Sequence, residues 1–183
     1  MRNLIFGINL TADGCCDHTK MIPSEEIYEY YSNLMRDVDL LVFGRKTYQL
    51  MVPYWPDIAK SQSESKAANE FAEAFDAIPK IVFSRSLDGP ERNAQIVRTN
   101  LRDEMLKLKH EQGISILAGG VSIPSQLMEL GLIDEYRFIV HPVIAGEGRR
   151  LLEGVNLPQR FQLKLADSKV LEPGCVALRY LKQ

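Results

Sequence analysis

The chain has 183 residues, enough for one domain with a sizeable core, and 45% hydrophobic and 25% charged residues are typical of a globular protein. Its formal net charge of −2 lacks the basic excess that binding to nucleic acid or to an anionic membrane requires. No run approaches the ~20 apolar residues of a membrane span, and the N-terminus does not have the pattern of a signal peptide. We therefore expect a single cytoplasmic domain over residues 1–183.

Strand-like and helical segments alternate through the first two thirds of the chain. An apolar strand over residues 4–10 leads into the turn at 12–14, and Ser24 is placed to cap a helix. A short helix from Arg45 is expected to end in a turn around residues 53–56, because prolines break helices. Further strands are predicted at 40–43, 80–83, 94–98 and 114–117, and further helices within 61–76, after Asn100 and before Gly131.

The alternation of strands and helices ends after Asp134. Residues 136–143, 161–170 and 176–181 read as strands without long helices between them, and Glu172-Pro173-Gly174 is a hairpin signal. Alternating strands and helices form parallel crossover units, and a closing hairpin adds antiparallel strands at one edge. The sequence therefore predicts an α/β fold with a mostly parallel mixed sheet and a C-terminal antiparallel hairpin.

The cysteines and histidines do not form a chelating pattern. Cys15, Cys16 and Cys175 are odd in number, and the histidines are scattered, so we expect neither a disulfide framework nor a metal site. Cys15 and Cys16 are either core residues or redox-sensitive thiols.

Two strand-to-helix junctions have the features of an anion site. Each places glycine at the carboxyl end of a strand, where open α/β sheets bind ligands. Glycine permits close approach of the backbone, and the helix start offers free N–H groups. In the first junction Arg45 and Lys46 add positive charge. The junctions are Gly44-Arg45-Lys46-Thr47-Tyr48 and Ala118-Gly119-Gly120-Val121-Ser122.

A third strand ends in Ser84-Arg85. The planar guanidinium of Arg85 matches the oxygens of a phosphate, such as the 2′-phosphate that distinguishes NADPH from NADH.

These segments, in this order, resemble the dihydrofolate reductase-like superfamily over nearly the whole chain. The resemblance is closer to the C-terminal reductase domain of bacterial riboflavin-biosynthesis deaminase-reductases. The residues that carry it include Thr11-Ala12-Asp13-Gly14, Gly131-Leu132-Ile133-Asp134-Glu135, Pro142-Val143-Ile144 and Gly146-Glu147-Gly148-Arg149. The resemblance implies the three-layer fold of the superfamily, in a stand-alone reductase without the deaminase domain.

The resemblance also implies NADPH as cofactor. The pyrophosphate would lie near Gly119, Gly120, Val121 and Ser122. The adenosine half and its 2′-phosphate would be held by residues 44–47 with Ser84 and Arg85. The nicotinamide would lie beside the first strand and the Asp13-Gly14 loop. In riboflavin synthesis the family reduces the ribosyl group of an aminopyrimidine phosphate, of the 5-amino-6-(5-phosphoribosylamino)uracil type.

The substrate side is less defined. Asp13, Gly14 and Asp17 are candidates for substrate contact, and Asp17, His18 and Glu29 are candidate proton donors. No acidic residue stands clearly where dihydrofolate reductases protonate a pterin. Dihydrofolate reduction and a nucleotide-binding module without turnover remain alternatives.

Three further expectations concern Gly120 and the oligomeric state. The Gly119–Gly120 peptide bond should be cis, and a methyl group on Gly120 should point toward the phosphates. The apolar strands after Tyr136 should have a covered edge, which predicts a homodimer. Apart from the second chain, the expected binding partner is a small-molecule substrate.

Overall fold

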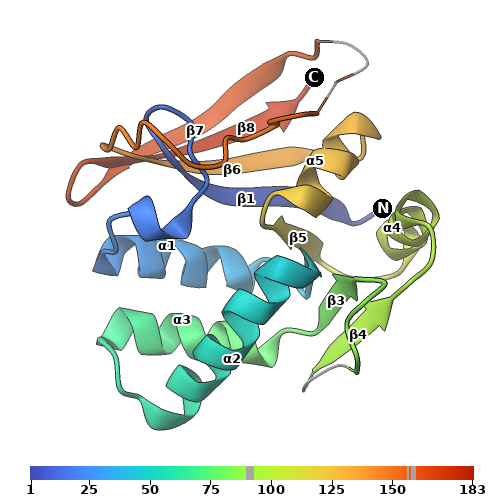
Figure 1. Ribbon diagram of the computed structural model, residues 1–183, viewed down its shortest axis with the longest axis horizontal. Helices are drawn as coiled ribbons and strands as arrows, with labels where there is room; N and C mark the ends of the chain where they lie inside the picture. Colours follow the sequence, from blue (N-terminus) through green and yellow to red (C-terminus); the bar gives the residue numbers. More distant parts are fainter. Residues whose placement is uncertain (90–92, 156, 158–159) are drawn as a thin grey trace.

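A mixed sheet forms the centre of the molecule. The computed structural model describes residues 1–183 apart from 90–92, 156 and 158–159 (Figure 1). The described strands form one sheet in the order β4-β3-β2-β5-β1-β6-β8-β7. Their bounds are β1 Asn3–Thr11, β2 Leu40–Gly44, β3 Lys80–Phe83, β4 Ala94–Val97, β5 Ser115–Gly119, β6 Glu135–His141, β7 Leu163–Leu171 and β8 Cys175–Lys182.

The strands from β4 to β6 in this order run parallel, and β8 and β7 close the sheet as an antiparallel hairpin. The helices between the strands are α1 Glu25–Arg36, α2 Arg45–Ser61, α3 Lys66–Ala77, α4 Leu101–His110 and α5 Ser122–Glu129, with a short 3-10 helix at His18–Lys20. The predicted mixed α/β fold with its C-terminal hairpin is confirmed.

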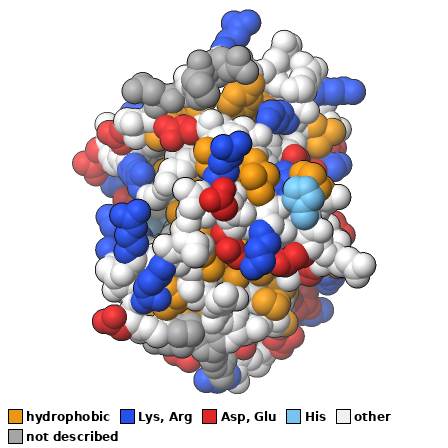
Figure 2. All heavy atoms as spheres, turned by 90° about the vertical axis from the view of Figure 1, so that its right-hand side faces the viewer, with side chains coloured by type: hydrophobic (Ala, Val, Ile, Leu, Met, Phe, Trp, Pro, Cys, Tyr) orange, Lys and Arg blue, Asp and Glu red, His pale blue; other side chains and the backbone are white. Residues whose placement is uncertain are grey.

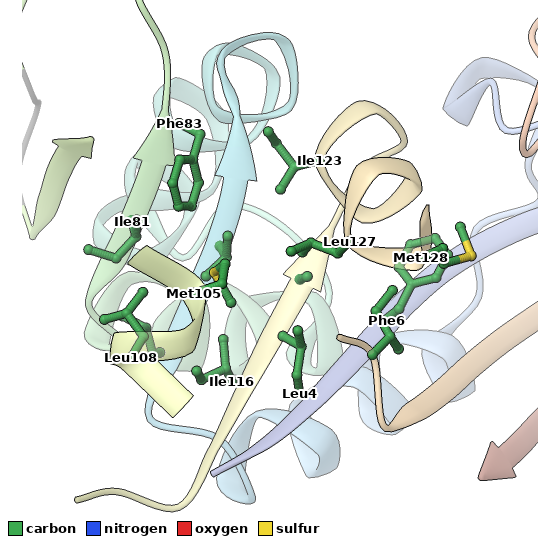
Figure 3. Close-up of a cluster of buried hydrophobic side chains, with 14 of the residues drawn as sticks. Leu4, Phe6, Ile81, Phe83, Met105, Leu108, Ile116, Ile123, Leu127 and Met128 are labelled. Atoms are coloured by element: carbon green, nitrogen blue, oxygen red, sulfur yellow. The ribbon is translucent and has the colours of Figure 1, made fainter. Parts of the chain in front are cut away.

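Two apolar layers hold the helices on the sheet. The helices α1, α2 and α3 cover one face, and α4 and α5 cover the other (Figure 1). On the α4–α5 side, Met105 and Leu127 are fully buried against side chains of the central strands (Figure 3). Each fully buried side chain of this size contributes about 1.5–3 kcal/mol. Successive side chains of β1 alternate between the layers, with Leu4 and Phe6 in one and Ile5 in the other.

Three helices begin where the sequence places a polar cap. The Ser24 hydroxyl accepts from the N–H of Ile27, and the Asn100 side chain accepts from the N–H groups of Arg102 and Asp103. Ser65 caps α3 in the same way. These bonds satisfy helix N–H groups that have no partner within the helix.

The helix after β2 is longer than predicted. Instead of turning at residues 53–56, α2 continues through Pro53 and Pro56 to Ser61. Proline removes a helix hydrogen bond, but Val52, Pro56 and Ile58 are buried against the α1–α3 side. Packing of this stripe outweighs the local preference to break, so the predicted turn was wrong.

Among the described residues, no helix combines the length and the apolar character that crossing a bilayer requires.

Candidate functional site

The carboxyl ends of the parallel strands meet at one edge of the sheet, and both glycine junctions lie there. Gly44 ends β2 and Gly119 ends β5, and these two strands are neighbours. We call residues 44–47 and 119–122 together the glycine edge. A ligand at this edge would face the starts of both α2 and α5.

The glycines of this edge allow close packing of the chain on itself. A Cβ on Gly119 would lie 2.7 Å from Cε1 of Phe43, and a Cβ on Gly120 would lie 2.1 Å from Oγ1 of Thr47. Gly120 also has φ +81°, in the left-handed region that favours glycine. The turn after β5 therefore packs directly against the Thr47 side chain in the first turn of α2.

Two expectations about Gly120 are wrong. The cis peptide bond found among the described residues is Glu172–Pro173, so the Gly119–Gly120 bond is trans. A trans bond avoids the ~2.5–4 kcal/mol of a non-proline cis bond, and glycine at positive φ makes the tight turn instead. A methyl group on Gly120 would meet Thr47 rather than project toward a ligand.

The helices α2 and α5 begin without a side-chain cap, unlike α1, α3 and α4. Neither Gly44 nor Val121 offers a side chain that bonds to the first helix N–H groups. Uncapped N–H groups at a helix start attract anions, and the helix dipole adds to this attraction. The glycine edge thus presents two such helix starts.

Cationic side chains surround the same edge. Arg45 and Lys46 are exposed on the first turn of α2, where Arg45 donates to Gln49. Arg149, in the loop after β6, donates through Nη1 to Oγ of Ser122 at 3.3 Å. Arg149 belonged to the motif that supported the resemblance, but its contact with the start of α5 becomes visible only in three dimensions.

A groove of about 610 Å³ opens beside the glycine edge, at the ends of β3 and β4. Phe83, Val97 and Ile123 give it an apolar floor, and Figure 3 shows Phe83 and Ile123 at the end of the core. Its polar lining includes Ser84, Arg85, Arg98, Thr99, Asn100 and Arg102. We call it the arginine groove.

The arginine groove contains Arg85 as expected and adds two arginines that sequence reasoning missed. No hydrogen bond or ion pair to another described residue holds the Arg85 guanidinium, whereas Arg98 donates to the carbonyl of Leu87 at 2.7 Å. The Ser84 hydroxyl accepts from the N–H groups of Ser86 and Leu87 and so shapes the turn that carries Arg85. Arg98 joins the groove because it follows β4, which pairs with β3, and Arg102 joins it from the first turn of α4.

The face that carries α4 and α5 has Lys and Arg interspersed with Asp and Glu side chains (Figure 2). Asp103 and Glu129 line the arginine groove as well. The positive charge of the groove is therefore confined to the part where its arginines lie.

Asp13 ties the loop after β1 to the loop after β6. Its carboxylate accepts from the Thr11 hydroxyl at 2.6 Å and from the N–H groups of Ala145 and Gly146 at 3.0 Å, and it pairs with Arg150. The Thr11 hydroxyl, followed by these N–H groups, holds the pKa of Asp13 well below its ordinary value. Asp13 therefore orders the loops, with its carboxylate occupied within the protein.

Further bonds join these two loops, which we call the clasp (residues 11–20 and 143–151). Cys16 N–H donates to the carbonyl of Arg149, and Lys20 pairs with Glu147 at 2.8 Å. Gly14, at φ +81°, makes the turn inside the clasp.

The remaining candidates lie on two elements, with Asp17 and His18 side by side at the 3-10 helix and Glu29 on α1. Asp17 caps the 3-10 helix by accepting from the N–H and hydroxyl of Thr19, and these bonds lower its pKa. His18 is exposed, 3.8 Å from Asp17. Glu29 is exposed on α1. The structure thus brings the cofactor candidates to one edge but does not gather these proton-donor candidates into one cluster.

Known proteins share this fold and sequence pattern. The Bacillus subtilis protein YyaP, which is uncharacterized, is 30% identical over 151 residues, or 82% of this chain and 77% of YyaP. A Shewanella sp. PV-4 protein ascribed to riboflavin biosynthesis superposes with a TM-score of 0.76 at 18% identity, over 100% of this chain and 99% of that one.

A second solved structure is a diaminohydroxyphosphoribosylaminopyrimidine deaminase/5-amino-6-(5-phosphoribosylamino)uracil reductase from Thermotoga maritima. It superposes with a TM-score of 0.67 at 15% identity, over 100% of this chain but 57% of that one. At these identities the likeness shows the fold. The sequence model of the RibD C-terminal domain matches residues 3–177. The chain therefore belongs to the RibD C-terminal domain family.

Proposed function

We propose that this chain is an NADPH-dependent reductase that transfers hydride to a small heterocyclic substrate, of the 5-amino-6-(5-phosphoribosylamino)uracil type. The observation that carries the proposal is the arginine groove, which continues from the glycine edge at the carboxyl ends of the strands. Membership of the RibD C-terminal domain family supports the reductase class.

The described residues fit a dinucleotide with an extra phosphate. The apolar floor of the arginine groove suits an adenine ring, and Arg85, Arg98 and Arg102 offer guanidinium groups to the 2′-phosphate. The uncapped starts of α2 and α5, with Arg45 and Lys46, suit the pyrophosphate. The sequence-based prediction differs at one point, because it gave residues 44–47 to the adenosine half and only residues 119–122 to the pyrophosphate.

NADPH, when bound, supplies the hydride. The reduction adds that hydride to the carbon of a C=O or C=N bond and a proton to its heteroatom, and it leaves NADP⁺. The clasp is suited to exclude water beside β1, because its two loops bond to each other through Asp13.

Dihydrofolate reduction fits less well. Glu29 is exposed, and the Glu26 carboxylate accepts from the N–H of Glu172 in the β7–β8 hairpin. Among the described residues, α1 therefore offers no buried carboxylate for a pterin.

Titration with both nicotinamide cofactors tests the proposal. We expect NADPH to bind more tightly than NADH, because a charge-assisted hydrogen bond to a phosphate is worth about 1.5–3 kcal/mol, or about 10- to 150-fold in Kd. Arg85→Ala should narrow this difference by about that factor and leave NADH affinity unchanged. Arg36→Ala is the control, since Arg36 is exposed on α1 and bonds to Asn33.

Equal affinities of the wild-type chain for both cofactors would contradict the phosphate assignment. Oxidation of NADPH with 5-amino-6-(5-phosphoribosylamino)uracil would support the reductase, and oxidation with dihydrofolate instead would favour the alternative. Tight binding without turnover of either compound would indicate a nucleotide-binding module.

A further inference from the structure

Asn9 is the polar residue within the run of residues 4–10 of the central strand β1. Its neighbours Ile8 and Leu10 are buried on the α4–α5 side, so alternation places Asn9 on the α1 side. Gly7 of β1 pairs with Gly119, the last residue of β5, whereas Asn9 pairs with Ile139 of β6. Asn9 therefore lies two residues past the end of β5, where the glycine edge begins.

Two side chains fix the amide oxygen of Asn9. Oδ1 lies 3.4 Å from the hydroxyl of Tyr31 on α1 and 3.4 Å from Nε2 of His141 at the end of β6. The Tyr31 hydroxyl donates to Oδ1, and Nε2 of His141 does so as well when it carries the ring proton. The oxygen of Asn9 therefore faces these two donors, and its NH₂ group faces away from them.

The tautomer of His141 follows from its other nitrogen. Nδ1 accepts from the N–H of Ile22 at 3.1 Å, so the ring proton is on Nε2 and donates to Asn9. His141 is 1% exposed, and this burial lowers its pKa, which keeps the ring neutral. Cys175 Sγ lies 3.5 Å from Nδ1 and is buried on the same side. The described groups that face the ring bear no charge.

The NH₂ group of Asn9 is left as a free donor that solvent can reach. It makes no hydrogen bond to a described residue. Fully buried side-chain nitrogens and oxygens without a partner are found, among the described residues, at Arg2, Ser125 and Arg179 and not at Asn9. An amide whose oxygen is fixed in this way presents its donors in a defined direction.

Aromatic rings continue from Tyr31 away from the strand. The Tyr31 ring lies over Gly7, where an added Cβ would be 3.8 Å from Cε1 of the ring. Tyr31 contacts Phe71 edge to face, and Phe71 contacts Trp55 with ring centroids 4.6 Å apart. Phe71 is buried and supports the partly exposed Tyr31 ring, and a ring held in this way beside a directed donor matches a planar heterocycle that carries an acceptor oxygen.

We propose that Asn9 is a substrate-recognition residue whose side-chain NH₂ donates to a ring carbonyl of a planar heterocyclic substrate, with Tyr31 and His141 as positioning residues. This inference rests on the proposed reductase function. Beyond that function, it assigns substrate recognition to Asn9, on the face of β1 opposite to α4 and α5.

Asn9→Asp tests the donor, because it keeps the size and one acceptor oxygen and replaces NH₂ by oxygen. We expect kcat/KM for 5-amino-6-(5-phosphoribosylamino)uracil to fall by about tenfold or more, mainly through KM, since a hydrogen bond is lost and two oxygens repel. NADPH affinity should not change. Asn33→Asp, on the exposed side of α1, should leave both constants unchanged.

A second readout does not depend on turnover. In ¹H–¹⁵N spectra of the whole chain, the Asn9 NH₂ signals, assigned by their loss in Asn9→Asp, should shift when this pyrimidine is added with or without NADP⁺. The Asn33 signals should stay. Tyr31→Phe keeps the ring and removes one donor to Oδ1, so we expect a smaller rise in KM than in Asn9→Asp at unchanged kcat.

The outcomes separate the inference from the function on which it rests. Unchanged KM in Asn9→Asp together with unmoved NH₂ signals would overturn the role of Asn9, while NADPH oxidation by the wild type would leave the reductase standing. Absence of NADPH binding would overturn the reductase, and shifted Asn9 signals with the pyrimidine alone would still support recognition at Asn9. An unchanged KM in Tyr31→Phe would remove the positioning role of Tyr31.

Discussion

Gly120 shows how one residue combines backbone conformation with packing. At φ +81° an L-amino acid is strained, and the position of a Cβ is already occupied by the Thr47 side chain. Gly14 has the same φ of +81°, but a Cβ there would meet no atom within 4 Å. The two glycines therefore separate the backbone effect from the steric one.

We expect Gly120→Ala to destabilise the fold more than Gly14→Ala. Left-handed backbone costs an L-residue about 1–2 kcal/mol, which both variants share, and a Tm decrease of about 2–4 °C accompanies each kcal/mol in a chain of this size. Gly120→Ala adds the clash with Thr47, which Thr47→Ala in the same chain should partly relieve. Thermal unfolding of the three variants checks this, and equal Tm values for the two single variants would contradict the steric account.

Single residues also mark where sequence reasoning ends. Gly44, Gly119 and Arg85 stand at ends of apolar runs, so the local pattern was enough to place them at the edge of a sheet. Arg98 and Asn9 carry no such signal, because the groove and the amide network exist only after β4 pairs with β3 and β6 pairs with β1.

At the scale of elements, the clasp couples two loops that are far apart in sequence. The loop after β1 and the loop after β6 come together because these strands are parallel neighbours, with Thr11 paired to His141 (Figure 1). Asp13 is the shared acceptor for N–H groups of the second loop. Loss of its charge should therefore loosen both loops at once.

We expect Asp13→Asn to reduce hydrogen-exchange protection at Ala145 and Gly146. The amide retains one acceptor oxygen but places an NH₂ group toward Arg150. The folded-state pKa of Asp13 lies below the unfolded value. The carboxylate therefore contributes fully to the free energy of unfolding above about pH 4, and this contribution is lost progressively as the pH falls below about 4. The wild-type and Asp13→Asn proteins should therefore converge in stability as the pH falls further. Asp57→Asn, exposed on α2, is the control.

Elements differ in how far local sequence determines them. The apolar runs of β1, β2 and β3 and the caps of α1 and α4 were predicted, because burial and capping depend on adjacent residues. The continuation of α2 through two prolines was not, because it depends on a buried stripe that packs against α1 and α3.

For the whole molecule, the sheet has two edges of different character. At one end β4 is short, with four residues. At the other end β7 is nine residues long and exposed over most of its length, and Val170 and Leu165 are 72% and 52% exposed. A long exposed edge strand with apolar side chains pairs readily with another strand. The order of strands in the sheet, which the sequence pattern could not provide, is what leaves β7 in this position.

We expect a homodimer in which the β7 strands of two chains pair antiparallel. A two-fold axis at Ser168 would place Asp167 opposite Lys169 of the partner subunit. By symmetry this pair of opposite charges would occur once on each side of the axis. Light scattering at micromolar concentration should give twice the chain mass of 20.8 kDa. Val170→Lys should shift the mass toward one chain, because it puts a charge beside the paired edge, whereas Leu50→Lys on the exposed side of α2 should not. A wild-type mass of one chain would contradict the dimer, and a dimer that persists in Val170→Lys would place its interface elsewhere.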